Sequence, residues 1–332
     1  MQQKYTMDYL DDLFERLENN DLRPGLTLPE GVSYQTNLTV SWNARIESKK
    51  LSDPKWISPL KERLNKEKIT IEKINIIRVL IPLADKNKEN SIADYIITFI
   101  KQEKTRWVRD VALSSLNNSE LEIINEKEYL FELIKDKDWQ IKLSALGLWK
   151  KLDKSYSNRI EDVCLDLIEK NQKKPHELSS ICGVLAKHGT TKSLPQIKEI
   201  AKNNSKAFTV NSAINAVREI NGAKELDFFI EIFQTNRNND VKSMITQVLC
   251  EFGGESVIDL LIKRAKNILS KKRKTNMIYV GGSKPELVHI LTFLTTYDDK
   301  KVNKLIDFIR TKKIELMDET ELTWFKEKVK TT

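Results

Sequence analysis

The chain contains few of the residues that interrupt regular structure, with only 10 glycines and 8 prolines among 332 residues. An all-β protein needs frequent turns rich in glycine and proline, so this composition disfavours that class and favours long helices. Long apolar runs are also missing. The run IIRVLI at 76–81 is typical, whereas a membrane-spanning helix needs about 18–20 apolar residues. We therefore expect a helical protein that does not associate with a membrane.

Cysteine and histidine are scarce, and this argues against disulfide and metal chemistry. The three cysteines are too far apart for a disulfide framework or a zinc motif, and we expect them to be buried: Cys164, Cys182 and Cys250. None of the three histidines has a second histidine or a carboxylate at ligand spacing. The sequence also lacks GxSxG, Walker and GxGxxG motifs. We therefore predict no catalytic residue, no metal and no cofactor.

The N-terminal segment MQQKYTMDYLDDLFERL has no apolar signal region, and so we expect a cytoplasmic protein. The net charge is +8 and the isoelectric point is about 9.1. An excess of positive charge favours binding to an anionic partner such as nucleic acid. The same charge also follows from a composition rich in Lys, Asn and Ile, as an AT-rich genome encodes. Both explanations stay open at this stage.

A repeat of just over 30 residues is the clearest pattern in the sequence. Three glycines recur at intervals of 33 and 31 residues: Gly189, Gly222 and Gly253. A large aliphatic residue follows each glycine by eight positions: Ile197, Ile230 and Leu261. Such a period is typical of helical solenoids, in which each repeat buries its apolar face against its neighbours.

Amphipathic helical segments follow one another from about residue 54. The segment 104–117 shows the i, i+3, i+4 spacing of a helix. The second helices of successive pairs are predicted at eight anchors, separated by 37, 33, 37, 32, 31, 46 and 35 residues: Ile71, Val108, Ile141, Leu178, Val210, Val241, Leu287 and Leu322. Regular spacing over so many intervals indicates an array of helix pairs.

Three segments within this array, KTRWVRDVALSSL, KDWQIKLSALGLW and NDVKSMITQVL, resemble the second helix of HEAT repeats. That helix carries a Val-Arg-like pair, often after an aspartate, with a small residue four positions after the first of the pair. Here the pairs are Val108–Arg109, Ile141–Lys142 and Val241–Lys242, and Ala112 and Ala145 are the small residues, whereas Ile245 departs from the pattern. The resemblance covers roughly residues 54–332.

The resemblance implies an all-α fold, a right-handed superhelical α-solenoid of about eight HEAT-like helix pairs. Residues 1–53 are predicted as an N-terminal cap, made of a short helix and an extended region in which TNLTVSW forms a strand or a loop. Residues 54–332 form the repeat array. A basic insertion loop at 270–283 interrupts it, and insertions in solenoids often carry binding residues.

Basic residues supply most of the candidate binding surface. A dense cluster lies in the insertion loop, where it suits either phosphate contacts or a solvated loop: Lys271, Lys272, Arg273 and Lys274. Other cations recur on the second helices: Arg106, Arg109, Lys142 and Lys242. In HEAT-like arrays the basic residue of the pair bonds an aspartate of a neighbouring repeat. We therefore expect a structural role for the last three and a surface role for Arg106, which has no implied partner.

Tryptophans offer a second kind of contact. Trp107 is a candidate for stacking on a base or anchoring a peptide, whereas Trp139 is expected to fill the gap between repeats. HEAT-like DNA glycosylases combine concave-face tryptophans with a catalytic aspartate, and the sequence RWVRD places Asp110 near Trp107. No second Trp–Asp pair follows. The sequence thus favours a non-enzymatic interaction protein with a protein partner. A nucleic-acid-binding solenoid is the alternative, and a glycosylase is a distant third.

Overall fold

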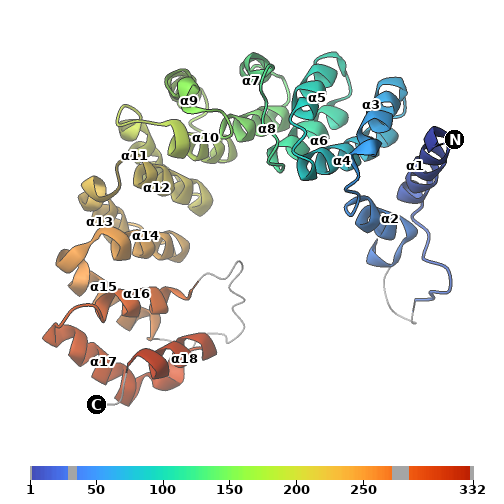
Figure 1. Cartoon of the computed structure of the whole chain (residues 1–332). Coiled ribbons are helices and arrows are strands. Elements are labelled where there is room, and N and C mark those ends of the chain that lie inside the picture. Colours follow the sequence, from blue (N-terminus) through green and yellow to red (C-terminus); the bar gives the residue numbers. More distant parts are fainter. Residues whose placement is uncertain (1, 29–35, 271–283, 330–332) are drawn as a thin grey trace. The chain divides into compact units, whose positions relative to one another are not determined.

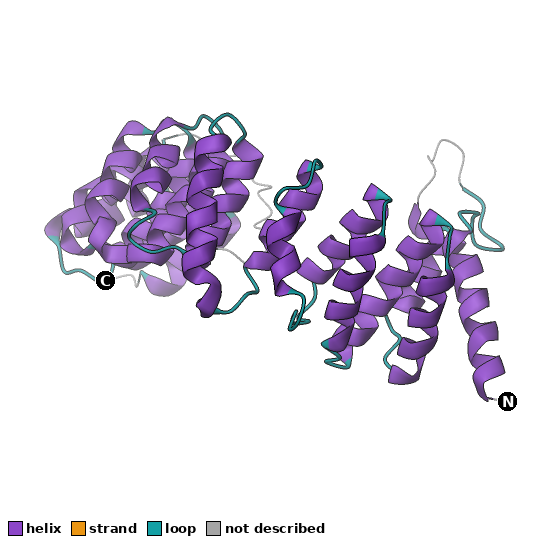
Figure 2. Ribbon diagram, turned by 90° about the horizontal axis from the view of Figure 1, so that it is seen from above, coloured by secondary structure: helices purple, strands orange, loops and turns teal. Residues whose placement is uncertain are grey.

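The computed structural model describes residues 2–28, 36–270 and 284–329. These residues are predominantly helical and form no β-strand; a single isolated bridge joins Leu22 to Thr39. The all-α class predicted from the sequence is therefore confirmed (Figure 2). In the same ranges, no helix combines the length and the apolar character that crossing a bilayer requires.

The chain divides into two compact units, Met1–Lys154 (unit 1) and Ser155–Thr332 (unit 2). Unit 1 contains α1 (Gln2–Glu18), α2 (Val40–Ser48), α3 (Ile57–Lys66), α4 (Thr70–Lys86), α5 (Ser91–Gln102), α6 (Arg106–Asn117), α7 (Lys127–Leu133) and α8 (Trp139–Trp149). Unit 2 contains α9 (Ser157–Lys170), α10 (Pro175–His188), α11 (Leu194–Asn203), α12 (Ala207–Asn221), α13 (Leu226–Thr235), α14 (Asn239–Phe252), α15 (Ile258–Ile268), α16 (Glu286–Leu294), α17 (Lys300–Lys312) and α18 (Glu319–Lys328).

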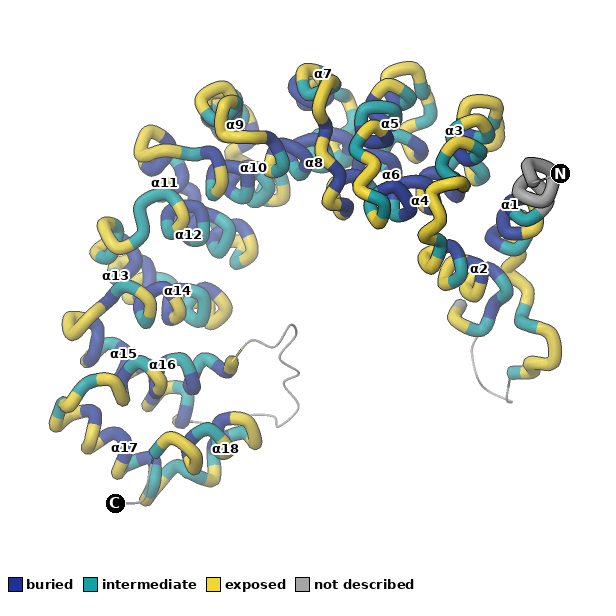
Figure 3. The backbone as a smooth tube through the Cα atoms, viewed as in Figure 1, coloured by how far each residue is buried: buried dark blue, intermediate teal, exposed yellow. Residues whose placement is uncertain are grey.

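Within each unit the helices form two layers (Figure 1). In unit 1 the even-numbered helices lie side by side, α4 against α6 and α6 against α8, and each contacts the odd-numbered helix before it. In unit 2, α10, α12, α14, α16 and α18 likewise follow one another, and α10, α12, α14 and α16 each contact the odd-numbered helix before them. Buried residues lie mainly between the layers, and exposed residues lie at the helix ends and connecting turns (Figure 3). The hydrophobic core of each unit thus extends along the row of helices.

The apolar anchors explain why the chain folds into these helices. Six of the eight predicted anchors are buried, one in each of α6, α8, α10, α12, α14 and α16. The first and last predictions were wrong in register. Ile71 is exposed at the start of α4, and the core position is Ile74 one turn later. In α18, Leu322 is partly exposed whereas Phe325 is buried.

The repeated glycines allow close approaches at helix ends. Gly189 and Gly253 end α10 and α14, where a Cβ atom would lie 2.6 Å from the Leu185 carbonyl oxygen and 2.5 Å from that of Leu249, respectively. Gly222 ends α12 with a φ of +50°, a conformation that favours glycine. Two of the three aliphatic residues that follow are buried, but Ile230 is partly exposed and Phe229 takes its place in the core.

The segment TNLTVSW forms neither a strand nor an extended loop. Residues 36–38 make a 3₁₀ turn, and α2 begins at Val40. The reason is a helix cap: the Thr39 hydroxyl oxygen accepts a hydrogen bond from the Trp42 backbone amide at 3.2 Å. A threonine in this position stabilises a helix start, and this outweighs the strand propensity of its neighbours.

Candidate functional site

Helices α4, α6 and α8 of unit 1 begin with the same turn. The carboxylates of Glu67, Glu103 and Asp136 each accept the backbone N–H two residues later, at 2.8, 2.7 and 2.8 Å. Each turn therefore fixes its own geometry just before α4, α6 or α8.

Cations from the preceding even-numbered helix hold two of these carboxylates. Lys73 Nζ lies 2.6 Å from Glu103 Oε2, and Arg109 Nη2 lies 2.7 Å from Asp136 Oδ2. Burial raises the pKa of Glu103, but hydrogen bonds from Lys73 and Thr105 outweigh it, and the pKa lies below its ordinary value. The pKa of Asp136 is lowered in the same way, against burial, by the Asp138 amide and by Arg109. These ion pairs hold the starts of α4, α6 and α8 in one register.

The middle residue of each turn is a lysine: Lys68, Lys104 and Lys137. All three are exposed, and within the described ranges none of them has a carboxylate partner. Their spacing follows the helix spacing, because each occupies the same position in an equivalent turn. Within the described residues, unit 1 therefore carries a line of lysines without ion-pair partners along the N-terminal ends of α4, α6 and α8.

Large apolar side chains are exposed along the same line. Ile69 is 54% exposed, Ile71 38%, Trp107 54% and Trp139 50%. They lie within the first two residues of α4, α6 and α8 or directly before the helix. We call these four residues, together with the three lysines, the α4–α6–α8 edge. Clustered exposed apolar and aromatic side chains with cations beside them are typical of binding surfaces.

The sequence-predicted basic residues of the helices are mostly engaged within the fold. Arg109 bonds Asp136 of the next helix pair, as the HEAT resemblance implies. Lys142 contributes favourable charge near the same aspartate, and Lys242 lies over the Phe233 ring at 5.4 Å. Arg106 is exposed, as expected for a surface candidate, but it does have partners: its guanidinium contacts the carboxylate of Asp138 and the side chain of Gln140. The cause is local, because Asp138 caps the start of α8 beside the start of α6.

The burial of the tryptophans differs from the prediction. Trp107 is exposed as expected, but Trp139 is also half-exposed and does not fill a gap between helices. Trp149 is the buried one, and its indole N–H donates to the Leu130 carbonyl oxygen at 3.3 Å. Sequence reasoning missed the three lysines of the edge. The signal was present as an acid–lysine pair (EK, EK and DK) before each of three successive even-numbered helices.

The predicted basic cluster, Lys271, Lys272, Arg273 and Lys274, lies outside the described residues.

Features that would indicate an enzyme are weak in the described parts of the chain. Asp110, the nominee for a glycosylase, is partly buried on α6, accepts a hydrogen bond from the Ser144 hydroxyl at 3.4 Å, and lines neither of the two cavities described below. Burial raises the pKa of Cys182 and of Cys250 to about 12, so neither thiol is ionised near neutral pH. Within the described ranges no group of three or more His, Cys, Asp or Glu side chains is arranged to hold a metal ion.

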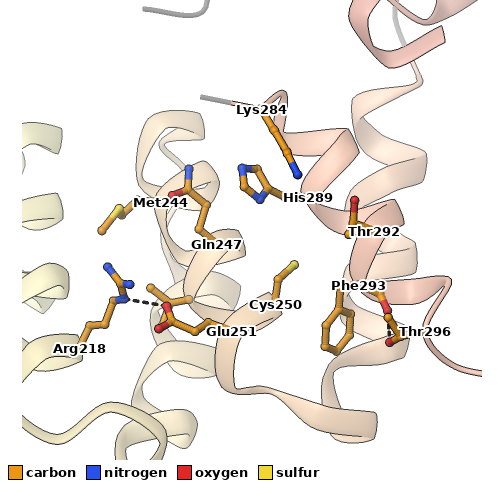
Figure 4. Close-up of a pocket in the computed structure, with 11 residues that line it drawn as sticks. Arg218, Met244, Gln247, Cys250, Glu251, Lys284, His289, Thr292, Phe293 and Thr296 are labelled. Atoms are coloured by element: carbon orange, nitrogen blue, oxygen red, sulfur yellow. Dashed lines mark hydrogen bonds and ion pairs between the residues drawn. The ribbon is translucent and has the colours of Figure 1, made fainter. Parts of the chain in front are cut away.

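One cavity of unit 2, of about 480 Å³, lies among α12, α14 and α16 (Figure 4). Its charged lining is partly compensated, because Arg218 Nε lies 2.8 Å from Glu251 Oε2. Burial, aided by Lys284, lowers the pKa of His289, so this imidazole is neutral near pH 7. The thiol of Cys250 is protonated at this pH, so it is not a thiolate nucleophile.

Comparison with models of known protein families and with curated protein sequences found no match to this chain.

Proposed function

We propose that the helix pairs α3–α4 through α17–α18 are eight HEAT-like repeats of an α-solenoid, with α1 and α2 as the N-terminal cap. Three observations support this reading. The even-numbered helices recur every 31–37 residues over most of the chain, they stack side by side within each unit, and Arg109 bonds the turn of the next pair. A stack of this kind offers long surfaces that no single repeat could provide.

The function that this geometry supports best is non-enzymatic binding of a protein partner through the α4–α6–α8 edge. A single observation carries the proposal: four large apolar side chains are exposed on three neighbouring helix starts. Tryptophan is among the residues that contribute most to binding when a partner covers them. The ion pairs at Glu103 and Asp136 fix these helix starts, so little conformational entropy is lost on binding.

The charges of the edge indicate the kind of partner. Lys68, Lys104 and Lys137 have no carboxylate of their own within the described chain, so a partner that supplies carboxylates would complement them. We therefore propose an acidic segment with apolar anchors as the occupant. Its leucine or aromatic side chains would contact Trp107 and Trp139, and its carboxylates would lie near the lysines.

Single-stranded nucleic acid is the second candidate, and the same two features favour it. Exposed indoles can stack on bases, and evenly spaced cations can contact the backbone phosphates. The two candidates differ in their dependence on salt, because binding to nucleic acid releases counterions for each phosphate neutralised. Four of the seven residues of the edge are apolar and three are cationic, and this balance favours a protein partner as the first candidate.

Replacing both Trp107 and Trp139 by alanine is expected to weaken peptide binding at least about tenfold, because the buried contact area of both indoles is lost. The probes are labelled short peptides of alternating Leu and Glu, with Leu–Lys peptides and single-stranded oligonucleotides as comparisons. Fluorescence anisotropy across a salt series measures the affinities. Both tryptophans are exposed, so the melting temperature should stay close to that of the parent protein.

Two matched variants serve as controls. Phe208→Ala removes a 40% exposed aromatic residue of unit 2 and should leave peptide binding unchanged. Lys68→Gln/Lys104→Gln/Lys137→Gln should reduce the salt dependence, whereas the same change at Lys173, Lys224 and Lys263 should not. Tryptophan-dependent binding of oligonucleotides but not of acidic peptides would favour the second candidate. Equal affinity of the Leu–Glu and Leu–Lys peptides would contradict the proposal of an acidic protein partner, and oligonucleotide binding that does not depend on Trp107 and Trp139 would contradict the second candidate.

A further inference from the structure

A second feature of unit 1 is a cavity of about 580 Å³ bounded by α1, α2, α4 and α6. One wall is apolar, formed mainly by Leu17, Trp42 and Ile46. Trp42 and Ile46 are about 40% exposed, so their faces are open to a ligand. Hydrogen-bonding groups also line the cavity, among them Asn75, Asp85, Ser115, Asn118 and Ser119.

Three cations line this cavity, and only one carboxylate does: Arg45, Lys49 and Arg78 against Asp85. The described residues provide no hydrogen bond or ion pair for the guanidinium of Arg45 or of Arg78. The nearby acids are engaged elsewhere. Asp85 Oδ1 accepts the Glu120 backbone amide at 2.8 Å. Glu47 holds Arg16 and the Tyr9 hydroxyl, at 2.5 and 2.8 Å.

The two guanidinium groups also act on each other. Partial burial lowers the pKa of Arg78, and the nearby charge of Arg45 lowers it further, although both arginines are exposed to solvent at the mouth of the cavity. Two like charges that share a cavity wall without a counterion repel each other. An anion between them would turn this repulsion into two attractive contacts. Arginine suits this task because its planar group donates two parallel hydrogen bonds to an oxyanion.

We infer that this cavity binds a phosphate monoester, with the phosphate between Arg45 and Arg78. A monoester carries nearly two negative charges at pH 7 and can neutralise both guanidinium groups, whereas a carboxylate carries one. The organic group of the ester packs on Trp42 and Ile46, and the side-chain amides of Asn75 and Asn118 are further donors at the wall. This site is separate from the α4–α6–α8 edge and does not depend on the function proposed for it.

Two kinds of ligand carry a phosphate monoester: a protein with a phosphorylated side chain, and a small phosphorylated compound. A phosphodiester of nucleic acid is a different ligand, because it carries one charge per phosphate and lacks the terminal oxygen of a monoester.

The test titrates the full chain with phenyl phosphate, inorganic phosphate, benzoate and a phosphotyrosine peptide by calorimetry. We expect phenyl phosphate to bind more tightly than inorganic phosphate, which lacks the aromatic group, and more tightly than benzoate, which has one charge. Lowering the pH from about 7.5 to about 5.5 should weaken binding of the ester, because its second proton binds with a pKa of about 6. If the phosphotyrosine peptide binds more tightly than phenyl phosphate, the natural ligand is a phosphorylated protein. If the two bind with equal affinity, the natural ligand is a small phosphorylated compound.

Arg45→Gln and Arg78→Gln should each weaken phenyl phosphate binding about tenfold or more, because each removes a charged, bidentate donor. Arg78→Lys should retain part of the affinity through its charge. Arg237→Gln, at an exposed position of unit 2, is the matched control and should bind normally. Circular dichroism melts confirm that each variant is folded. The inference is overturned if phenyl phosphate fails to saturate the protein, if it binds no better than benzoate, or if the glutamine variants bind it unchanged. Equally tight binding of a phosphodiester oligonucleotide at this site would also overturn it.

Discussion

Replacing Ala112 by aspartate is expected to destabilise unit 1 by at least about 3 kcal/mol, since an ionised carboxylate buried without a partner costs several kcal/mol. Ala112 is fully buried on α6, which packs between α4 and α8. The added side chain would also enter a contact that only a methyl group fills. For a unit of this size the loss corresponds to a fall of roughly 10 °C in melting temperature, measured by circular dichroism during heating.

Ala223→Asp is the matched control for this change. Ala223 is exposed in a 3₁₀ turn, and a surface substitution of this kind should change stability by no more than about 0.5 kcal/mol. A melting curve of the Ala112 variant that coincides with the parent curve would show that α6 does not pack in the register described here.

Glu286→Ala should destabilise unit 2 by about 3–5 kcal/mol, because it leaves the guanidinium of Arg264 buried and uncompensated. Arg264 is 9% exposed, and its Nε and Nη2 atoms each lie 2.8 Å from a Glu286 oxygen. The Thr246 hydroxyl donates to the same carboxylate at 2.8 Å, so three helices, α14, α15 and α16, meet at this group.

A double-mutant cycle separates the ion pair from the packing. The cycle compares the parent, Arg264→Met, Glu286→Leu and the protein with both changes. The double variant has neither charge, and we expect it to be more stable than either single variant. Urea unfolding measures all four proteins under the same conditions. Single variants as stable as the parent would show that the pair is open to solvent rather than buried.

The sequence carried enough information to predict the helices and most of their core positions. Val108 and Ile141 recur because every even-numbered helix must bury the same face against its neighbours. Predictions failed at residues that do not need to be buried against a neighbouring helix. Ile71 lies at the open end of α4, and Ile230 was placed by its distance from a glycine although Phe229 points into the core. The repeat period predicts the spacing between successive helices more accurately than it predicts which residues of each helix face the core.

The binding features were less predictable. Trp107 was identified because an indole can stack on a base or anchor a peptide, but the exposure of Trp139 depends on how the start of α8 meets α6. The cavity of Arg45 and Arg78 was not foreseen at all. Its two arginines come from α2 and α4, and α2 precedes the repeating part of the chain, so no periodic pattern connects them. Sites formed between a repeat and a segment outside the repeats need coordinates to be found.

The central claim is that the α4–α6–α8 edge is the binding surface, and oxidative footprinting of the tryptophans tests it most directly. In the free protein Trp107 and Trp139 should react readily, whereas buried Trp149 should stay unreactive. Saturation with the Leu–Glu peptide should protect Trp107 and Trp139 and leave the remaining tryptophans unchanged. If the peptide binds while Trp107 and Trp139 react as fast as before, the partner lies elsewhere on the molecule and the proposed function is wrong.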